Sequence, residues 1–238
     1  MKIELPQGRF FLASESSDPV ILVAGGRPPN EKWLKQVAQC YPVWAIDRGI
    51  DVCRSAAVIP KILVGDADSG AVEAWQWAES HHVPIVRHSI DKDLTDLQLT
   101  LQELGGRHPG ASALLTGGMG RRFDHAYSNV FSLQESKLWD VHAIGLVDEA
   151  EALFLVEGGQ AFRAELTQSP IAVSLMPLSA VCDNVNSRGV HWPLQEATLT
   201  MKHPGGICNR LAEGSQSVSV SLDHGLLGVY FCWRESGL

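Results

Sequence analysis

Three short segments carry the residue types that bind metal ions and phosphate groups. They are Gly65–Ser69 (Gly-Asp-Ala-Asp-Ser), Asp91–Asp96 (Asp-Lys-Asp-Leu-Thr-Asp) and Thr116–His125, which combines glycines with two arginines, an aspartate and a histidine. The apolar run Lys61–Val64 leads directly into the first segment, as expected of a buried strand that ends at a site. Together the three segments predict an apparatus for handling metal-bound phosphates.

The first segment places Asp66 and Asp68 two residues apart. In an extended chain such residues project to the same side, and two carboxylates held close together repel each other unless a cation lies between them. Mg²⁺ is the natural candidate because it prefers oxygen ligands and is commonly held by one or two carboxylates together with substrate phosphates. A solvated acidic turn, with Ser69 capping the next helix, explains this segment equally well when it is taken alone.

The second segment holds three further acids and a lysine: Asp91, Asp93, Asp96 and Lys92. The lysine can contact a phosphate as a point charge. The alternative explanation is helix capping, because Thr95 begins a capping-box pattern and acidic side chains favour the first turn of a helix. Capping alone accounts for Asp93 or Thr95, but three acids and a lysine that follow another acidic motif favour a functional site.

The third segment is rich in glycine, which lets backbone N–H groups approach an anion closely. Arg121 and Arg122 can neutralise charge on a phosphoryl group during its transfer. The segment lacks the G-x-x-x-x-G-K-[ST] pattern of a Walker A loop. Taken singly, Arg122 and His125 are also explained as surface-paired residues, and a lone histidine is more often structural than catalytic.

Apolar runs and helical periodicities alternate along the first part of the chain. Buried strands are expected at residues 19–24, 42–46, 61–64, 83–86 and 111–115, with amphipathic helices between them. This alternation predicts crossover connections and a mostly parallel sheet, whose strand ends lie where open α/β sheets bind ligands. The first 19 residues are unassigned, although Gly8–Ala13 fits an edge strand.

After about residue 148 the pattern changes to short extended segments separated by turn residues. No long helical periodicity interrupts them. We therefore expect a mostly parallel α/β domain over residues 1–147 and an antiparallel β domain over residues 148–238.

Composition excludes several other classes of protein. The 238 residues are 45% hydrophobic and 19% charged, as in a stably folded globular protein, and the net charge of −8 with dispersed Lys and Arg argues against nucleic-acid binding. No stretch approaches the roughly 20 apolar residues of a membrane span, and no signal-type apolar core is present, so we expect a cytoplasmic protein without membrane contact. The five cysteines form no C-x-x-C pair, which indicates reduced thiols rather than disulfides or a zinc site.

The order of the motifs resembles the thiamine pyrophosphokinase family, whose members carry G-D-x-D-S, D-x-D-x-T-D and G-G-R-x-D-H-like segments in turn. Asp47–Gly49 looks like the family's earlier aspartate-glycine turn, and Ser174–Leu178 and Gly206–Asn209 look like parts of its C-terminal β domain. The resemblance spans nearly the whole chain. The chain departs from the family pattern at Cys208, where serine is common in the thiamine pocket, and at Arg48, where a small residue is usual beside the nucleotide.

The resemblance implies an N-terminal α/β domain that binds ATP and Mg²⁺, followed by a C-terminal β-sandwich that binds thiamine and forms a homodimer. The implied activity is that of a thiamine diphosphokinase, a transferase that moves pyrophosphate from ATP to the hydroxyl of thiamine. The residues marked as catalytic are Asp66, Asp68, Asp96, Lys92 and Arg122, with Asp66, Asp68 and Asp96 as metal ligands. Candidates for binding the substrates are Asp47, Asp91, Asp93, Thr95, Thr116, Gly117, Gly118, Arg121, Asp124, His125, Cys208 and Asn209.

Two alternatives stay open because phosphate-handling residues do not select the acceptor. One is a diphosphokinase that acts on another hydroxymethyl heterocycle, such as a pterin. The other is a nucleotide- or thiamine-binding module without turnover, against which the intact acids and basic residues argue. None of the seven tryptophans is assigned to ring stacking.

Overall fold

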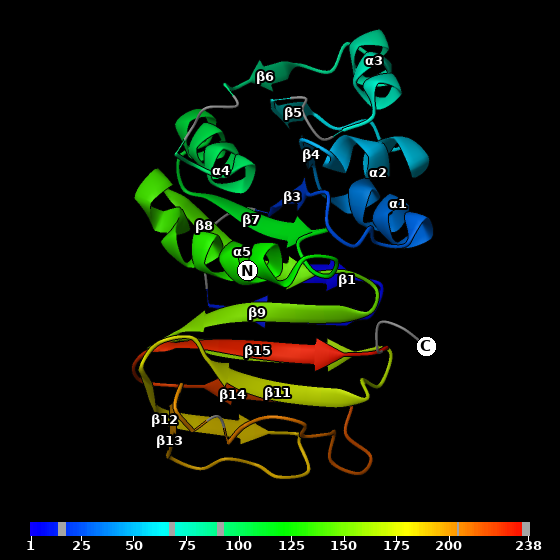
Figure 1. Ribbon diagram of the computed structural model, residues 1–238. Coiled ribbons are helices and arrows are strands. Elements are labelled where there is room, and N and C mark those ends of the chain that lie inside the picture. The colour runs from blue at the N-terminus through cyan, green and yellow to red at the C-terminus, as the bar shows by residue number, and fades with distance from the viewer. Residues whose placement is uncertain (14–17, 67–69, 90–92, 204, 235–238) are drawn as a thin grey trace. The chain divides into compact units, whose positions relative to one another are not determined.

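The computed structural model describes residues 1–13, 18–66, 70–89, 93–203 and 205–234 (Figure 1). The chain divides into two compact units, one of Ser16–Asp148 and one that joins Met1–Glu15 to Glu149–Leu238. A parallel sheet in the first unit and antiparallel strands in the second confirm the predicted fold class. Residues 1–15, which the sequence analysis placed with the α/β domain, join the β unit instead.

The unit Ser16–Asp148 is built on a parallel sheet with the strand order β8-β7-β3-β4-β5-β6. The strands are β3 (Val20–Val23), β4 (Val43–Ile46), β5 (Ile62–Gly65), β6 (Ile85–Arg87), β7 (Ala111–Thr116) and β8 (Val141–Val147). Every residue of β3, β4, β5 and β7 is buried. Burial on both faces explains why these segments are continuous apolar runs rather than alternating ones.

Helices cover both faces of this sheet. They are α1 (Glu31–Cys40), α2 (Gly49–Ser55), α3 (Val72–Ser80), α4 (Asp96–Arg107), α5 (Phe123–Gln134) and the 3-10 helix η1 (Glu135–Trp139). The chain moves from β3 outward to β6 and then returns to β7 on the other side of β3, so right-handed crossovers place α1–α3 on one face and α4 and α5 on the other (Figure 1). The carboxyl ends of β3 and β7 are therefore a topological switch point, where open α/β sheets bind ligands.

Local sequence explains where two of these helices begin. Asn30 caps α1, because its side-chain oxygen accepts hydrogen bonds from the backbone N–H groups of Lys32 (2.9 Å) and Trp33 (3.4 Å). The predicted capping box at Thr95 is confirmed at the start of α4. Among the described residues, no helix has both the length and the apolar character needed to cross a membrane.

The second unit contains two groups of antiparallel strands. One sheet has the order β1-β2-β10-β14-β12-β13, and β15 lies between β11 and β9 in the other group. Their bounds are β1 (Lys2–Leu5), β2 (Gly8–Leu12), β9 (Glu151–Glu157), β10 (Ala161–Leu166), β11 (Ala172–Pro177), β12 (Val181–Arg188), β13 (Ala197–Thr200), β14 (Ser217–Ser221) and β15 (Leu226–Cys232).

An aromatic cluster joins the two groups of strands into a sandwich. Phe10 from β2 stacks on Phe154 from β9 with ring centroids 4.5 Å apart, and Phe162 from β10 lies 6.0 Å from Phe231 on β15. All four rings are almost fully buried. Because Phe10 fills this core while β2 pairs with β10, the N-terminal residues belong to the β unit.

Replacing Phe10 by alanine tests this placement. Phe10→Ala is expected to lower the free energy of unfolding by roughly 3–5 kcal/mol, because it leaves a cavity among the other three rings. Denaturant unfolding followed by circular dichroism measures the change. Phe123→Ala, at a ring that is 81% exposed, is the matched control and is expected to change stability by less than about 0.5 kcal/mol. Equal effects of the two substitutions would contradict the assignment of β2 to the core.

Candidate active site

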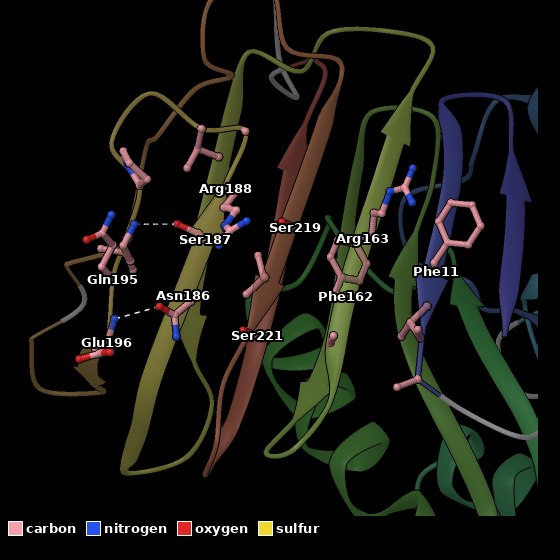
Figure 2. Close-up of a pocket in the computed structure, with 18 residues that line it drawn as sticks. Phe11, Phe162, Arg163, Asn186, Ser187, Arg188, Gln195, Glu196, Ser219 and Ser221 are labelled. Atoms are coloured by element: carbon pink, nitrogen blue, oxygen red, sulfur yellow. Dashed lines mark hydrogen bonds between the residues drawn. The ribbon is translucent and has the colours of Figure 1, made fainter.

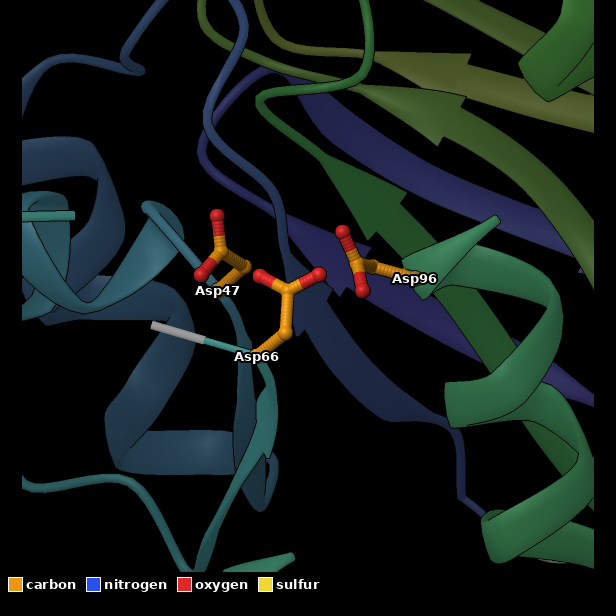
Figure 3. Close-up of side chains that lie close together, drawn as sticks. All are labelled: Asp47, Asp66 and Asp96. Atoms are coloured by element: carbon orange, nitrogen blue, oxygen red, sulfur yellow. The ribbon is translucent and has the colours of Figure 1, made fainter. Parts of the chain in front are cut away.

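Three aspartates converge at the carboxyl edge of the parallel sheet. Asp47 follows β4, Asp66 follows β5, and Asp96 is the first residue of α4. One carboxylate oxygen from each lies within 4.8 Å of those from the other two, and Figure 3 shows the three side chains pointing toward one another. Asp66 and Asp96 were predicted as metal ligands, Asp47 was predicted as a substrate-binding residue from the family resemblance, and the structure brings all three together.

The backbone around Asp47 is arranged to bring its side chain next to Asp66. Asp47 has a positive φ of 40°, and its N–H donates to the carbonyl oxygen of Val64 on the neighbouring strand (2.7 Å). A Cβ at Gly65 would lie 2.9 Å from both Cα and Cβ of Asp47. The glycine that precedes Asp66 is therefore required for the close approach of the two strands at this point.

Asp96 is positioned by the start of α4. The hydroxyl oxygen of Thr95 accepts a hydrogen bond from the N–H of Gln98 (3.3 Å), and the N–H of Thr95 donates to the side-chain oxygen of Gln98 (3.0 Å). The helix begins in a defined place as a result, and its dipole favours a negative charge at Asp96. Thr95, a candidate for substrate binding in the sequence, is engaged in this cap.

The carboxylates of this cluster repel one another electrostatically. Two ionised carboxylates at such distances repel each other by at least roughly 3 kcal/mol at an effective dielectric constant of about 20. A helix dipole contributes only about 0.3–1 kcal/mol, so it does not offset the repulsion at Asp96. A donor set made of carboxylate oxygens alone fits a hard divalent cation such as Mg²⁺.

The remaining residues of the two acidic motifs divide into two groups. Asp68, Asp91 and Lys92 lie outside the described residues. Asp93 is described, exposed to solvent and not part of the cluster of Asp47, Asp66 and Asp96. Within the described part of the chain, the metal-binding candidates are thus the three aspartates that end or begin regular elements.

The glycine loops after β3 and β7 are joined to each other at the switch point. Ala24 N–H donates to the carbonyl oxygen of Thr116 (2.8 Å), and Gly26 N–H donates to that of Gly117 (2.7 Å). Gly117 has a φ of 67°, and a Cβ there would lie 2.2 Å from the carbonyl oxygen of Ala24. The hydroxyl of Thr116 is buried without a hydrogen-bond partner in the described chain. The loop from Thr116 onward is therefore held by backbone contacts that leave no room for larger residues.

Arg27 and Asp148 also belong to the region of the glycine loops, and they were not among the residues predicted from the sequence. The Nε of Arg27 donates to Oδ2 of Asp148 (3.2 Å), and a Cβ at Gly120 would lie 2.7 Å from Cβ of Arg27. Asp148 is almost fully buried. Arg27 follows β3, the first strand of the parallel sheet in the chain, and this position could have marked it as a candidate. Its partner Asp148 lies 121 residues away in the chain, so the pair could not be inferred from spacing.

Arg122 and Asp124 form an exposed ion pair at the start of α5. The Nε of Arg122 donates to Oδ1 of Asp124 (3.0 Å), and the N–H of His125 donates to the same oxygen (2.9 Å). The hydrogen bond from Arg122 lowers the pKa of Asp124 to about 2, and the same pairing raises the pKa of Arg122. Asp124 thus holds the guanidinium in a defined orientation beside the glycine loop, while Arg121 precedes it with a φ of 58°.

The β unit has a cavity of about 270 Å³ around the predicted residue Asn209. Asn209 holds Trp192 from both sides: its Oδ1 accepts from the N–H of Trp192 (3.1 Å), and its Nδ2 donates to the carbonyl oxygen of Trp192 (2.8 Å). Trp192 also lines the cavity and is 58% exposed. Cys208 is exposed, donates its N–H to Oγ of Ser174 (3.0 Å) and does not line the cavity. A Trp–Asn pair with an accessible indole is suited to holding a flat ring.

Comparisons with known proteins found matches to both units of the chain. A family model described as "Thiamin pyrophosphokinase, catalytic domain" matches residues 34–143, and one described as "Thiamin pyrophosphokinase, vitamin B1 binding domain" matches residues 165–227. Thiamine pyrophosphokinase 1 of Oryza sativa subsp. japonica is 23% identical over 71% of this chain and 64% of its own length. Thiamine pyrophosphokinase of Bacillus subtilis is 24% identical over 80% of this chain and 88% of its own length.

Solved structures share the fold at low sequence identity. The crystal structure of thiamine pyrophosphokinase from Bacillus subtilis superposes with a TM-score of 0.78 at 21% identity, covering 92% of this chain and 100% of that one. Thiamin pyrophosphokinase from Candida albicans superposes with a TM-score of 0.77 at 15% identity, covering 91% and 89% of the two chains. The succession of strands and helices described above is therefore shared over nearly the whole chain.

Removing one charge from the acidic cluster tests whether it binds a divalent cation. Asp47→Asn is expected to raise the Mg²⁺ concentration that gives half of the metal-induced increase in Tm at least tenfold, while the Tm without metal stays equal or rises because repulsion is relieved. Thermal melts across a Mg²⁺ titration measure both quantities. Asp93→Asn, outside the cluster, is the matched control and keeps the wild-type response. An unchanged metal response in Asp47→Asn would exclude Asp47 as a ligand.

The ion pair at the start of α5 predicts how the charge of Asp124 and the stability of the fold depend on pH. Since the pKa of Asp124 in the folded state lies below its ordinary value of 3.8, the pairing stabilises the folded state above that pH and is lost as the pH falls through about 2. Arg122→Gln is expected to return the pKa of Asp124 toward 3.8, because the charged hydrogen bond is removed. An NMR titration of the carboxyl carbon measures this shift. Arg121→Gln serves as the control, and a shift of the same size in it would show that general charge, rather than the pairing, sets the pKa.

Proposed function

The chain belongs to the thiamin pyrophosphokinase family, and we propose that it transfers a pyrophosphate group from ATP to the hydroxyl of thiamine, with thiamine diphosphate and AMP as products. The observation that carries this proposal is the convergence of Asp47, Asp66 and Asp96 at the edge of the parallel sheet. In this proposal the unit Ser16–Asp148 handles ATP and the metal, and the β unit supplies the pocket for the thiamine rings.

The acidic cluster is the proposed Mg²⁺ site. Asp47, Asp66 and Asp96 would hold the ion, and the sequence motif proposes Asp68 as a further ligand. A bound Mg²⁺ offsets the negative charge of the ATP phosphates and of the group in transfer. Because Mg²⁺ keeps open coordination positions for phosphate oxygens, a small set of carboxylates is sufficient.

The glycine loop and its arginines are the proposed phosphate site. Gly117 and Gly118 follow β7 at the switch point and are buried, and Gly120 and the two arginines of the same loop are exposed to solvent. Arg122, oriented by Asp124, stabilises the charge that develops during the transfer, together with Arg121, and the sequence motif proposes Lys92 for the same role.

The proposed reaction forms one bond and breaks one bond. The hydroxyl oxygen of thiamine bonds to the β-phosphorus of ATP, and the bond from that phosphorus to the oxygen bridging to the α-phosphorus breaks, so that AMP leaves with the bridging oxygen. A carboxylate of the acidic cluster accepts the proton of the hydroxyl. The protein's contribution is mainly to position the two reactants and to stabilise the transferred charge.

The cavity beside Trp192 and Asn209 is the proposed site for the thiamine rings. The indole offers an aromatic surface, and Asn209 fixes the loop that carries it. Cys208 stands where the family commonly has serine, and its exposed thiol is a weaker hydrogen-bond donor than a hydroxyl. A homodimer, which the family resemblance implies, and a cytoplasmic location, which was expected from the sequence, are further parts of the proposal.

An assay of AMP release tests the proposal against its alternatives. ATP with thiamine is expected to give AMP, and ATP with a hydroxymethyl pterin is not. Asp66→Asn is expected to lower kcat by a factor on the order of 10² or more, because the cation that offsets phosphate charge is lost, whereas Asp93→Asn stays within a few-fold of the wild type.

The two other outcomes of the assay identify the alternatives. Turnover with the pterin alcohol and not with thiamine would identify a diphosphokinase of different specificity. Binding of thiamine and ATP without AMP release would identify a binding module. Near-native turnover in Asp66→Asn would overturn the metal site itself.

A further inference from the structure

A second and larger hollow lies on the outer face of the sheet β1-β2-β10-β14-β12-β13. Its volume is about 1250 Å³, and strands β2, β10, β14 and β12 form its floor, with the loop 189–196 as one wall (Figure 2). None of the residues proposed for catalysis or substrate binding lines it. The proposed function therefore leaves this hollow without a role.

The strand register places two arginines on either side of a serine in one row across the sheet. Phe11 pairs with Arg163, Arg163 with Ser219, and Ser219 with Arg188. Adjacent strands are about 4.8 Å apart, so the Cα atoms of the two arginines are separated by roughly 10 Å with Ser219 between them. Side chains of this length can reach the same small anion above Ser219. Ser221 and Asn186 form a second polar row beside the first.

The charges in the hollow favour an anion. Within the described part of the chain, Arg188 has no ion pair or hydrogen bond, and neither do the hydroxyls of Ser219 and Ser221. Glu196 is the acidic residue among those that line the hollow, against the two arginines. In a chain with a net charge of −8, this is a local excess of positive charge.

Arg163 already contacts two neighbours on its own face of the sheet. Its guanidinium pairs with Glu165 and lies 5.5 Å from the ring centroid of Phe11, toward which Figure 2 shows it turned. Glu165 also pairs with Arg9 (2.8 Å). Since Arg9 remains as a partner for Glu165, Arg163 can turn toward Ser219 without leaving that carboxylate unpaired.

The wall of the hollow is fixed to its floor by hydrogen bonds. Leu194 N–H donates to Oγ of Ser187 (2.9 Å), and Glu196 N–H donates to Oδ1 of Asn186 (3.0 Å), as the dashed lines in Figure 2 show. Leu194 lines both this hollow and the cavity beside Trp192. The hollow is thus a formed concavity, and one loop separates it from the proposed thiamine pocket.

We propose that this hollow binds a small phosphorylated molecule, whose phosphate lies over Ser219 between Arg163 and Arg188. Two guanidinium groups and two hydroxyls match the charge and the several acceptor oxygens of a phosphate, because arginine forms paired hydrogen bonds with such oxygens. The site is separate from the one at which ATP is proposed to react, and it does not depend on the identity of that reaction.

Calorimetric titration with inorganic pyrophosphate tests the proposal. All proteins carry Arg122→Gln and the buffer contains a chelator, so that the phosphate site proposed at the glycine loop does not compete. Arg188→Gln and Arg163→Gln are each expected to raise the Kd for pyrophosphate at least tenfold. Lys2→Gln, at an exposed residue of β1 that pairs with Glu4 and does not line the hollow, is the matched control and is expected to change it by less than threefold. Arg188→Lys keeps the charge but loses the paired hydrogen bonds, and an intermediate Kd is expected.

Several results would overturn the proposal. They are the absence of saturable binding to the parent protein, an equal loss of affinity in Lys2→Gln, or an unchanged Kd in both Arg188→Gln and Arg163→Gln. A parallel titration with citrate separates the two anion chemistries, since tighter binding of the tricarboxylate would show that the hollow is not a phosphate site. If Arg188→Gln does not fold, as judged by circular dichroism, then Arg188→Lys and Arg163→Gln decide the outcome.

Discussion

The mutual repulsion of three carboxylates is the constraint on which the rest of the α/β unit depends. Asp47, Asp66 and Asp96 lie close together, and a backbone feature helps to position each of them. Asp47 has a left-handed backbone, Asp66 follows a glycine that lets two strands approach, and Asp96 starts a capped helix. The scaffold thus concentrates negative charge at one place, which is the physical basis of the proposed cation site.

The switch point of the sheet supplies the complementary half of the site. Where β3 and β7 lead to opposite faces, their loops are joined by backbone hydrogen bonds, and the glycines there allow the two loops to pack closely. The buried pair of Arg27 and Asp148 ties this region to the end of the parallel unit. The residues proposed to bind the metal and those proposed to bind phosphate thus come from different crossovers of one sheet, so their arrangement depends on the order of the strands.

The β unit combines a rigid interior with two recognition surfaces. Its four stacked phenylalanines lie between the two groups of strands, which leaves the outer face of the larger sheet and the loop 189–196 available for ligands. Trp192 lines a small cavity beside this loop, and the side chain of Leu194 lines both that cavity and the hollow on the outer face. Occupation of one cavity can therefore influence the other through a few residues of the loop.

The sequence by itself determined the class of fold, most of the regular elements of the α/β unit and the chemistry of its acids. Periodicity reports burial locally, which is why the continuous apolar strands and the capping box at Thr95 were predictable. Asp66 and Asp96 were recognisable from their motifs, whereas Asp47 came only from the family resemblance, because a single acid at a strand end carries no pattern of its own.

Only the tertiary structure decided which distant residues meet. The pairing of β2 with β10, the contact of Arg27 with Asp148 and the row of Arg163, Ser219 and Arg188 each depend on strand order and register. Register is set by the packing of the whole core, and a shift of one residue would send every side chain of a strand to the opposite face. No local sequence signal contains that information, because it is a property of the assembled sheet.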